Sequence, residues 1–415
     1  MAFRLIIILS IIALAEYYSF ILIRSMVRNL PPVWRMSVTG VYLALTIATW
    51  LSFVLFRLIN WASMPHLVRN LFIAFVLGFV VGKIVILLIM LVDDIRRLLT
   101  WLIVSMAYKG GTGGEAVTKI ERSVFLRQAA LVMGGLTVLG FTAGIRNRYS
   151  YRVRKIKLNF PNLPAAFKGM RIIQISDIHT GSFDNHAAVA HGIDRVMDQS
   201  ADLILFTGDL VNNHSDEVDK KYQEIYSRLK APMGVYSTLG NHDYGDYVQW
   251  PTPEAKVANL DTLKGIHASM GWRLMMNEHI VLEKGGEKIA LIGIENWSAK
   301  ANFPKYGNMA KAMDGLKEKN IPFKILMSHD PSHWRAQVLQ EYKDIDLMLS
   351  GHTHGMQFGV DTKWYKWSPV QYMYNEWAGL YTEGNQNLYV NRGFGFLGYP
   401  GRVGIMPEIT LFELG

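Results

Sequence analysis

The stretch SGHTHGMQ, Ser350–Gln357, places two histidines one residue apart between glycines, directly after the apolar run Ile345–Leu349. The length and composition of this region predict a buried strand over Asp346–Ser350. His352 and His354 then lie in the loop that leaves the strand, where glycine on each side permits a tight turn. Two histidines at this spacing also occur in ordinary polar surface loops, so the stretch alone does not define a site.

Four further apolar runs in the C-terminal part each end in a small polar cluster. They are short and bounded by glycine or polar residues, as expected of buried strands. Because polar side chains repeatedly follow strand ends, we expect one site above the edge of a sheet. The runs and their clusters are Met170–Ser176 with Asp177 and His179, Asp202–Thr207 with Asp209, Val235–Leu239 with Asn241, His242 and Asp243, and Phe323–Met327 with His329 and Asp330.

These clusters supply oxygen and imidazole donors. Each cluster alone is common in structural loops, but their joint occurrence in this order indicates a metal site. Donors of this kind suit divalent ions such as Mn, Fe or Zn. The chain has no cysteine, which excludes a disulfide framework, a thiol nucleophile and a cysteine-ligated zinc site.

The order D-x-H, G-D, G-N-H-D, H and G-H-x-H resembles that of the calcineurin-like metallophosphoesterases over about Met170–Leu414. The resemblance is closest to small bacterial membrane-anchored members, whose domains end in a glycine-rich turn and a Pro-Glu-Ile strand. Here that ending reads NRGFGFLGYPGRVGIMPEITLFEL, Asn391–Leu414. The resemblance implies an α/β domain, a calcineurin-like αββα sandwich of two mixed β-sheets flanked by helices.

The resemblance also implies two divalent metal ions, of which Mn, Fe and Zn are the candidates. One would be held by Asp177, His179, Asp209 and His354, and the other by Asp209, Asn241, His329 and His352, so that Asp209 bridges them. Such a pair acidifies a bridging water, and the resulting hydroxide attacks phosphorus in line. The resemblance places His242 to protonate or stabilise the leaving group and Asp243 to orient the His242 ring.

Two other loop residues have open interpretations. Many relatives carry glycine where this chain has Met356, so the larger side chain either borders the substrate pocket or simply packs against the protein. Arg392 is either a phosphate contact or a member of a surface salt bridge.

Charge is divided unevenly along the chain. Residues 1–157 contain 19 Lys and Arg against 5 Asp and Glu, a net charge of +14, whereas the remainder contains 24 against 29, a net charge of −5. The basic excess flanks long apolar segments, where it is explained as membrane-flanking anchors. The acidic balance of the C-terminal part disfavours nucleic acid as a substrate.

Four N-terminal segments are apolar over about the 20 residues that cross a bilayer, although the fourth is shorter and rich in glycine. They are Phe3–Ile23, Ser37–Ile59, Leu71–Val92 and Gln128–Ile145. Because the first is long and three follow, we expect it to be retained rather than cleaved as a signal peptide. We therefore expect a membrane region over 1–150 with about four transmembrane helices and a metallophosphoesterase domain over 151–415.

Two features of these segments suggest how the helices pack. Gly140 and Gly144 form a GxxxG pair that permits close packing in a membrane, although a buried soluble helix is the alternative for this segment. Glu16 and Lys83 fall at similar depth in the first and third spans, which predicts an intramembrane ion pair. The alternative is that Lys83 reaches the membrane surface and Glu16 is protonated.

The positive residues also bear on orientation. The loops after spans one and three carry Arg24, Arg28 and Arg35, and Arg96, Arg97, Lys109, Lys119, Arg122 and Arg127. The positive-inside rule makes these loops cytoplasmic and the C-terminal domain extracytoplasmic. Six positive charges over Arg146–Lys157 oppose this assignment. The segment YKGGTGG, Tyr108–Gly114, is typical of a flexible linker.

These observations favour a multi-pass protein of the cell membrane that hydrolyses a phosphodiester or pyrophosphate, with a lipid-linked ester as the proposed substrate class. The aromatic-rich segment Trp364–Tyr381, WYKWSPVQYMYNEWAGLY, either borders the site and faces the bilayer or packs as ordinary structure. The alternative function is a non-catalytic membrane sensor or transporter-like protein with a phosphate-binding domain. The sequence does not define the oligomeric state.

Overall fold

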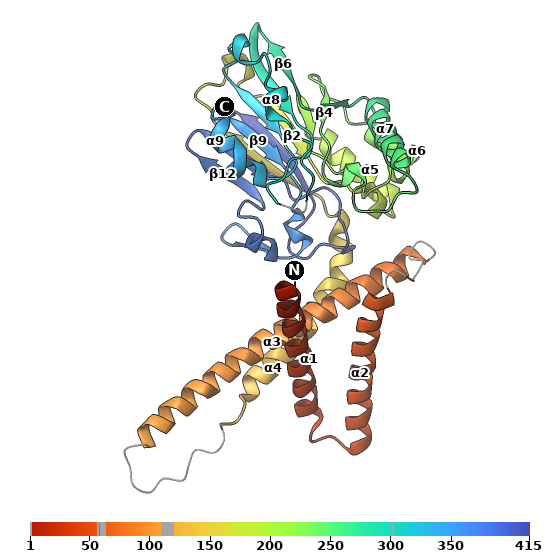
Figure 1. Cartoon of the computed structure of the whole chain (residues 1–415), viewed down its shortest axis with the longest axis vertical. Helices are drawn as coiled ribbons and strands as arrows, with labels where there is room; N and C mark the ends of the chain where they lie inside the picture. Colours follow the sequence, from red (N-terminus) through yellow and green to blue (C-terminus); the bar gives the residue numbers. More distant parts are fainter. Residues whose placement is uncertain (1, 56–57, 59–63, 109–119, 301–302) are drawn as a thin grey trace. The chain divides into compact units, whose positions relative to one another are not determined.

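The computed structural model describes residues 2–55, 58, 64–108, 120–300 and 303–415 (Figure 1). The chain forms two compact units, the membrane unit Met1–Ile145 and the C-terminal unit Arg146–Gly415. The linker expected over 108–114 lies outside the described residues, apart from Tyr108.

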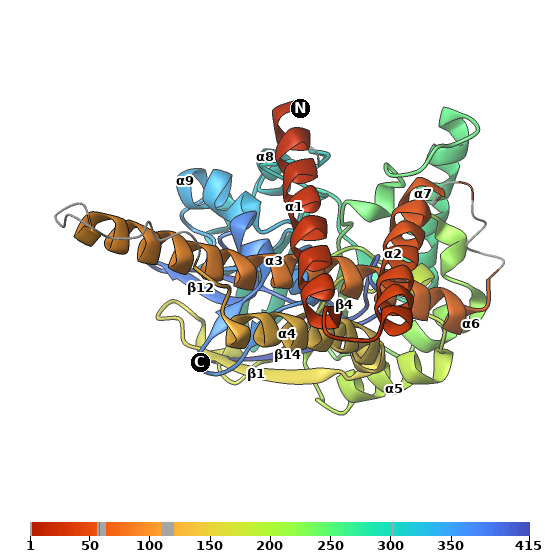
Figure 2. The same cartoon turned by 90° about the horizontal axis from the view of Figure 1, so that it is seen from below.

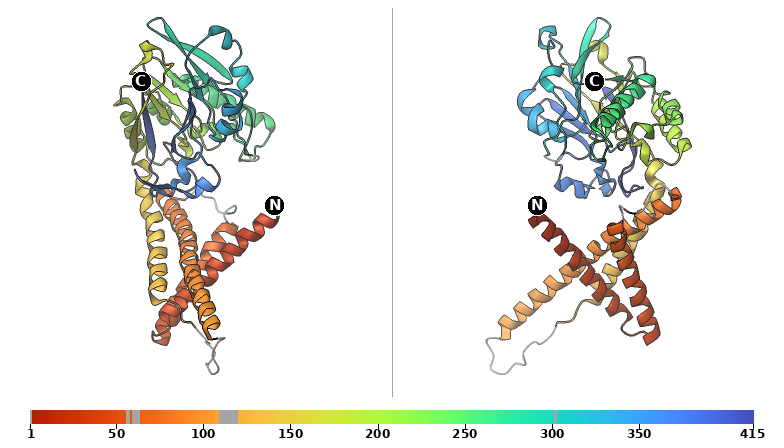
Figure 3. Two further views of the ribbon diagram at one scale, coloured as in Figure 1. Left: turned by 90° about the vertical axis from the view of Figure 1, so that its left-hand side faces the viewer. Right: turned by 45° about the vertical axis from the view of Figure 1, so that its right-hand side comes forward.

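The membrane unit consists of apolar helices. In the described part of the chain, four of them are long and apolar enough to cross a membrane, as expected from the sequence. They are α1 (Ala2–Val27), α2 (Pro32–Leu55), α3 (His66–Tyr108) and α4 (Val124–Gly144). Figure 3 shows α3 running alongside α4, which is the most extensive helix contact of this unit.

Helix α3 is much longer than the predicted span Leu71–Val92, and Arg96 and Arg97 lie within it rather than in a loop. The reason is local. Asp93 pairs with Arg96 at 2.9 Å and Asp94 with Arg97 at 2.8 Å, each three residues apart and therefore neighbours on the helix surface. The charges that suggest a loop in the sequence instead support the helix.

Small residues bring α3 and α4 together, but they are not those predicted. A Cβ atom on Gly78 would lie 2.9 Å from Phe141 Cβ, and one on Gly82 would lie 2.8 Å from Gly134 O. The backbones can approach this closely only because these positions lack side chains. A Cβ on Gly140 would meet no atom within 4 Å, so the packing role predicted for the Gly140–Gly144 pair is wrong at Gly140.

The predicted ion pair between α1 and α3 is confirmed. Lys83 Nζ lies 2.8 and 2.7 Å from the two carboxylate oxygens of Glu16 and also donates to Thr46 Oγ1 at 2.9 Å. Trp50 Nε1 donates to Glu16 Oε1 at 2.9 Å. Each charge therefore has several polar partners where lipid could supply none.

The C-terminal unit contains two six-stranded sheets, both mixed parallel and antiparallel. The first has the order β1 (Arg152–Leu158), β14 (Glu408–Leu414), β2 (Arg171–Ile175), β3 (Leu203–Phe206), β4 (Val235–Ser237) and β5 (Arg273–Leu274). The second has the order β12 (Gly379–Glu383), β13 (Gln386–Val390), β9 (Leu347–Ser350), β8 (Lys324–Met327), β7 (Glu287–Gly293) and β6 (Glu278–Lys284). Figure 2 shows β1 alongside β14 at the outer edge of the first sheet.

All five strands predicted from the sequence are present, as β2, β3, β4, β8 and β9. Their residues are buried because both faces of each sheet are covered. Side chains such as Ile172, Leu205, Ile325 and Leu349 form a core that combines both sheets. The outer face of the first sheet packs against α5 (His186–Met197), α6 (Lys220–Tyr226) and α7 (Pro253–Ser269).

Short helices α8 (Met309–Ala312) and α9 (Leu339–Glu341) cover the outer face of the second sheet. The unit is therefore the αββα sandwich expected from the sequence. A small ribbon, β10 (Val360–Asp361) with β11 (Lys366–Trp367), projects from the loop after β9.

Candidate metal centre

The polar clusters predicted from the sequence meet at one end of the sandwich. Strands β2, β3 and β4 are parallel neighbours in the first sheet, and β7, β8 and β9 are parallel neighbours in the second. The loops that follow parallel strands emerge at the same edge, so residues distant in sequence are brought together. Both sheets contribute side chains to this point.

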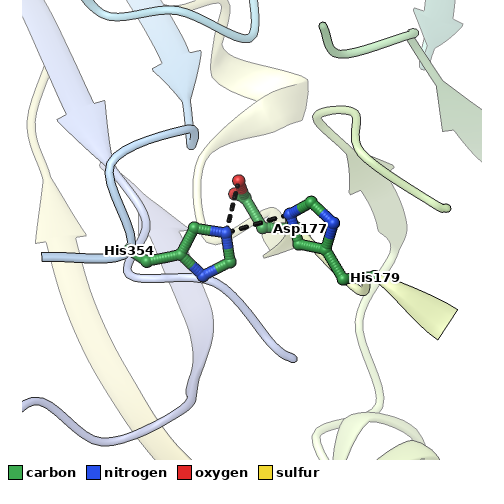
Figure 4. Close-up of side chains that lie close together, drawn as sticks. All are labelled: Asp177, His179 and His354. Atoms are coloured by element: carbon green, nitrogen blue, oxygen red, sulfur yellow. Dashed lines mark hydrogen bonds and ion pairs between the residues drawn. The ribbon is translucent and has the colours of Figure 1, made fainter. Parts of the chain in front are cut away.

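A first group combines Asp177 and His179, which follow β2, with His354, which follows β9. His354 Nε2 lies 3.2 Å from Asp177 Oδ1 and 3.1 Å from His179 Nε2 (Figure 4). Asp177 and His179 are fully buried and His354 is 7% exposed. Their ligand atoms are close enough to hold one ion.

A second group combines Asp177 with Asp209, which follows β3, and His329, which follows β8. Asp209 Oδ2 lies 3.1 Å from His329 Nε2 and 3.5 Å from His179 Nε2, so this one carboxylate reaches both groups. That is the position expected of a bridging ligand.

Asn241 and His352 adjoin the second group. Asn241 Oδ1 lies 2.8 Å from His352 Nδ1, and the His352 ring lies edge-on to that of His329 with centroids 5.2 Å apart. The backbone N–H of His352 donates to the Asp177 carboxylate at 2.9 Å. The structure thus places all seven residues predicted as ligands in one connected cluster.

The loops that carry these residues have unusual backbone conformations. Asp177, His179, Asp209, His352 and His354 all have φ between 50° and 74°. Each non-glycine residue in this region costs about 1–3 kcal/mol, and such strain concentrates at functional sites. At Gly351, a Cβ atom would lie 2.1 Å from Asp177 Oδ2, so only glycine permits the loop after β9 to approach the first group.

The electrostatics of the cluster favour cations. Burial alone would raise the pKa values of Asp177 and Asp209, but neighbouring histidines hold both well below the usual range. Burial lowers the pKa of His179 to about 3, whereas Asp209 and Asp177 overcome burial and raise the pKa of His329 to about 10. Two buried carboxylates therefore stay ionised and require positive charge beside them.

The hydrogen bonds of His329 show that the donor set fits a metal ion. Its Nδ1 donates to the carbonyl of Thr207 at 2.7 Å, which directs Nε2 towards the carboxylates. Nε2 is buried without a hydrogen-bond partner although Asp209 Oδ2 is only 3.1 Å away. A nitrogen and an oxygen this close but misaligned for a hydrogen bond suit two ligands of one cation.

His242 borders the cluster, with its ring centroid 5.0 Å from that of His179. Its Nδ1 donates to the carbonyl of Asn212 at 2.8 Å, which fixes the ring and leaves Nε2 available. The prediction that Asp243 orients this ring is wrong. The Asp243 carboxylate instead accepts hydrogen bonds from four backbone N–H groups: those of Asp209, Leu210, Val211 and Gly240.

Two further residues support the ligands without having been predicted. Tyr374, from the aromatic-rich segment, has its hydroxyl 2.8 Å from His352 Nε2. Arg402 is fully buried and donates to the carbonyls of Arg392 at 2.7 Å and Gly393 at 3.1 Å, as well as to that of Gly395. The sequence signal for Tyr374 is its place in the aromatic-rich segment Trp364–Tyr381, which was predicted to border the site, whereas the signal for Arg402 is only an arginine in a glycine-rich turn.

The salt-bridge interpretation of Arg392 is confirmed, except that the salt bridges are buried rather than on the surface. Arg392 is 2% exposed and pairs with Glu408 at 2.6 Å and Asp361 at 2.9 Å. Met356 is 50% exposed, so half of its surface is open to solvent and half is covered by the protein.

Comparison with known families agrees with this geometry. A family model described as calcineurin-like phosphoesterase matches residues 170–356, which contain every residue of the cluster. Residues 170–356 therefore form a calcineurin-like phosphoesterase domain. A second model, described as the probable transmembrane domain of calcineurin-like phosphoesterases, matches residues 3–148. The family consists of hydrolases that act on phosphoric esters and use a dinuclear divalent metal centre, and this chain is a multi-pass membrane protein.

Several curated proteins are similar to the chain. A zebrafish transmembrane protein with metallophosphoesterase domain is 28% identical over 68% of this chain, and the match spans 62% of that protein. The phosphodiesterase YaeI of Escherichia coli is 26% identical over 71% of this chain and 99% of its own length. The UDP-2,3-diacylglucosamine pyrophosphatase LpxG of Chlamydia trachomatis is 27% identical over 59% of this chain and 83% of its own length.

Proposed function

We propose that the chain is a membrane-anchored, metal-dependent phosphoesterase that hydrolyses a lipid-linked phosphodiester or pyrophosphate. The observation that carries the proposal is the convergence of buried carboxylate and imidazole side chains, with exposed aromatic residues near them in the sequence. The names of two relatives, a phosphodiesterase and a pyrophosphatase of a diacylated sugar nucleotide, support this substrate class.

The proposed ligands are those implied by the sequence: Asp177, His179, Asp209 and His354 for one ion, and Asp209, Asn241, His329 and His352 for the other. Bound there, two divalent cations would supply Lewis acidity towards phosphoryl oxygens and a reactive water at neutral pH. The protein holds the ligands rigidly, because Thr207 O fixes the His329 ring and Asp177 is bonded to the backbone of His352.

His242 is the proposed proton donor to the leaving oxygen. Because Asn212 O holds the proton on Nδ1, Nε2 is the atom that exchanges a proton with the substrate. The residue is partly exposed, unlike the fully buried His179 and His329, so a substrate arriving from solvent reaches it. Asp243 takes no part in the proton transfer in this proposal and holds the surrounding loops.

An aromatic rim supports a lipid-linked substrate. We give this name to five exposed residues: Met356, Trp364, Tyr365, Tyr372 and Met373. Trp364 is 87% and Tyr372 77% exposed, which is costly for rings in water and typical of residues at membrane interfaces. The rim adjoins the metal centre along the chain, since Met356 follows His354 by two residues and Met373 precedes Tyr374.

The experiment compares two substrates in detergent micelles with Mn²⁺ present. We expect the intact protein to cleave a diacylated pyrophosphate more efficiently than a water-soluble diester, and Asp209→Asn to abolish both reactions. Replacing Trp364 and Tyr372 with serine should reduce kcat/KM for the lipid substrate about tenfold and leave the soluble substrate unaffected.

The outcomes separate the parts of the proposal. Equal loss on both substrates in the rim variant would refute the lipid preference while leaving the phosphoesterase intact. Full metal occupancy without hydrolysis of any ester would instead favour the non-catalytic alternative. No bound metal in the wild-type protein would overturn the ligand assignment.

We also propose that the C-terminal unit is extracytoplasmic. The support is the arginine and lysine residues that follow the first and third predicted spans, of which Arg96 and Arg97 lie within α3, against few after the second. A protease added to intact cells should then cleave this unit. Cleavage only after lysis would place it in the cytoplasm.

A further inference from the structure

Helices α1 and α2 are joined by a short turn (Figure 1). A basic groove lies beside this turn in the membrane unit. Its volume is about 910 Å³, and it is lined by Arg24 from the last turn of α1, by Arg28 from the turn that follows and by Arg35 from the start of α2. Its walls continue with apolar side chains such as Ile21 and Leu43. All of these residues belong to the membrane unit, so the groove is distinct from the metal centre.

The three arginines have no carboxylate partner within the described residues. The acidic side chains Glu16, Asp93 and Asp94 pair instead with Lys83 and with arginines 96, 97 and 122. The Arg24 guanidinium lies over the ring of Phe20, 5.7 Å from its centroid. Three positive charges thus face one groove without a compensating negative charge from the protein.

The placement of the charges is unfavourable without a counter-ion. Arg24 lies in the last turn of α1 and Arg28 in the turn that follows, and both line the same groove, where their like charges repel. Arg35 lies in the first turn of α2, where the helix dipole disfavours a cation. An anion between the two helix ends would relieve both effects.

The groove is basic at one end and apolar at the other, so it matches a ligand that has a charged end and an apolar end. Arg24 and Arg28 lie at the end of the first apolar span and just beyond it, at the level where a phospholipid carries its phosphate. Ile21 and Leu43 lie deeper in their spans, beside the acyl region. Arginine binds phosphate through two parallel N–H groups. It therefore suits a phosphate headgroup better than a positive charge without this geometry would.

We propose that this groove binds the phosphate headgroup of an anionic phospholipid, with an acyl chain along Ile21 and Leu43. The inference is independent of the proposed reaction. It assigns to the membrane unit a lipid-binding role in addition to anchoring.

The test measures lipid binding to the intact protein in neutral detergent by native mass spectrometry, after treatment with chelator. The probes are phosphatidylglycerol, phosphatidylcholine and inorganic phosphate. Phosphatidylglycerol should bind, phosphatidylcholine should bind far more weakly, and inorganic phosphate should not compete. Equal binding of both lipids, or displacement by inorganic phosphate, would overturn the assignment to an anionic lipid.

Two variants locate the site. Arg24→Gln, Arg28→Gln and Arg35→Gln together should weaken phosphatidylglycerol binding by about 100-fold, since each basic residue near a lipid surface contributes about fivefold. Because these arginines also influence insertion, Gly40→Leu is the second variant. Gly40 lines the groove and a Cβ there meets no atom within 4 Å, so leucine fits the helix, fills the groove and keeps all charges. It should weaken binding about tenfold.

The matched control removes three positive charges elsewhere, through Arg146→Gln, Arg152→Gln and Lys155→Gln. All three side chains are exposed and lie outside the groove. The control should bind phosphatidylglycerol like the wild type. If it weakens binding as much as the arginine variant, or if Gly40→Leu has no effect, the lipid is held by general surface charge and the groove assignment is wrong.

Discussion

Tyr374→Phe removes a single hydroxyl that lies 2.8 Å from His352 Nε2 and 3.3 Å from Asp330 Oδ2. The hydroxyl donates to Asp330, so its oxygen accepts the proton of His352 Nε2. The Nδ1 lone pair of His352 is then directed towards Asn241 Oδ1, 2.8 Å away. Two acceptors at this separation suit two ligands of one cation, and Tyr374 selects the tautomer that makes His352 a ligand.

The expected loss of metal affinity in this variant follows from the burial of the contact between Tyr374 and His352. Tyr374 is 6% exposed, so phenylalanine leaves His352 Nε2 without a partner or a close water. An unsatisfied buried donor costs about 1–3 kcal/mol, which corresponds to about a 10- to 100-fold loss of affinity at the second ion. The first ion should be little affected, because Tyr374 contacts none of its proposed ligands.

Metal titration of the chelator-treated protein by calorimetry measures both sites. The variant should retain one tight site and weaken the other. Tyr389→Phe is the matched control, since this tyrosine is also buried but donates to Glu408, away from the ligands, and it should bind both ions normally. Two sites of wild-type affinity in Tyr374→Phe would refute the reasoning. Equal weakening of metal binding in Tyr389→Phe would show that the loss of affinity comes from general instability of the protein.

Three other outcomes are expected. His242→Gln should lower kcat by about 10²–10⁴ with unchanged metal content, whereas metal loss measured by atomic absorption would contradict its role as proton donor. Burial lowers the pKa of His267 to about 3, below its unfolded value near 6.5, so the unfolded state binds the extra proton. Stability should therefore fall by about 1.4 kcal/mol per pH unit as pH drops below about 6.5, and thermal unfolding of His267→Gln should lack this slope. Glu16→Lys should destabilise the membrane unit and Lys83→Glu should rescue it, as judged by melting temperature in detergent; absence of rescue would argue against the ion pair.

The strands that carry the ligands could be predicted because each is short, apolar and ends abruptly in polar residues. The order of the twelve strands in the two sheets could not, since it depends on long-range pairing such as that of β1 with β14. The end of α3 was missed for a different reason. Asp93 and Arg96 look like loop residues until their spacing of three is recognised as a pairing within a helix.

Errors about individual side chains share a physical origin. The GxxxG pattern at Gly140 does not reveal which side of α4 faces a neighbour, and that depends on the rotation of the helix. Asp243 follows His242 in sequence, but both lie in a short 3₁₀ turn where consecutive side chains point in different directions. Neighbouring positions in the chain therefore did not predict which side chains contact each other, whereas the position of a polar residue just after a strand did predict that it lies in the metal centre.

Asp243 and Arg402 are buried where their hydrogen bonds can hold the strained backbone of the metal centre. The ligand-bearing loops adopt left-handed conformations that would relax without restraint. Asp243 accepts N–H groups from the loops after β3 and β4, and Arg402 donates to carbonyls in the glycine-rich turn that contacts His354. The buried Asp243 carboxylate thus accepts hydrogen bonds from N–H groups on one side of the site, although burial raises the pKa of this group to about 7, and the buried Arg402 guanidinium donates to carbonyl groups on the other side. Charged groups make stronger hydrogen bonds than neutral ones, so they are suited to holding ligands in a conformation that the backbone alone disfavours.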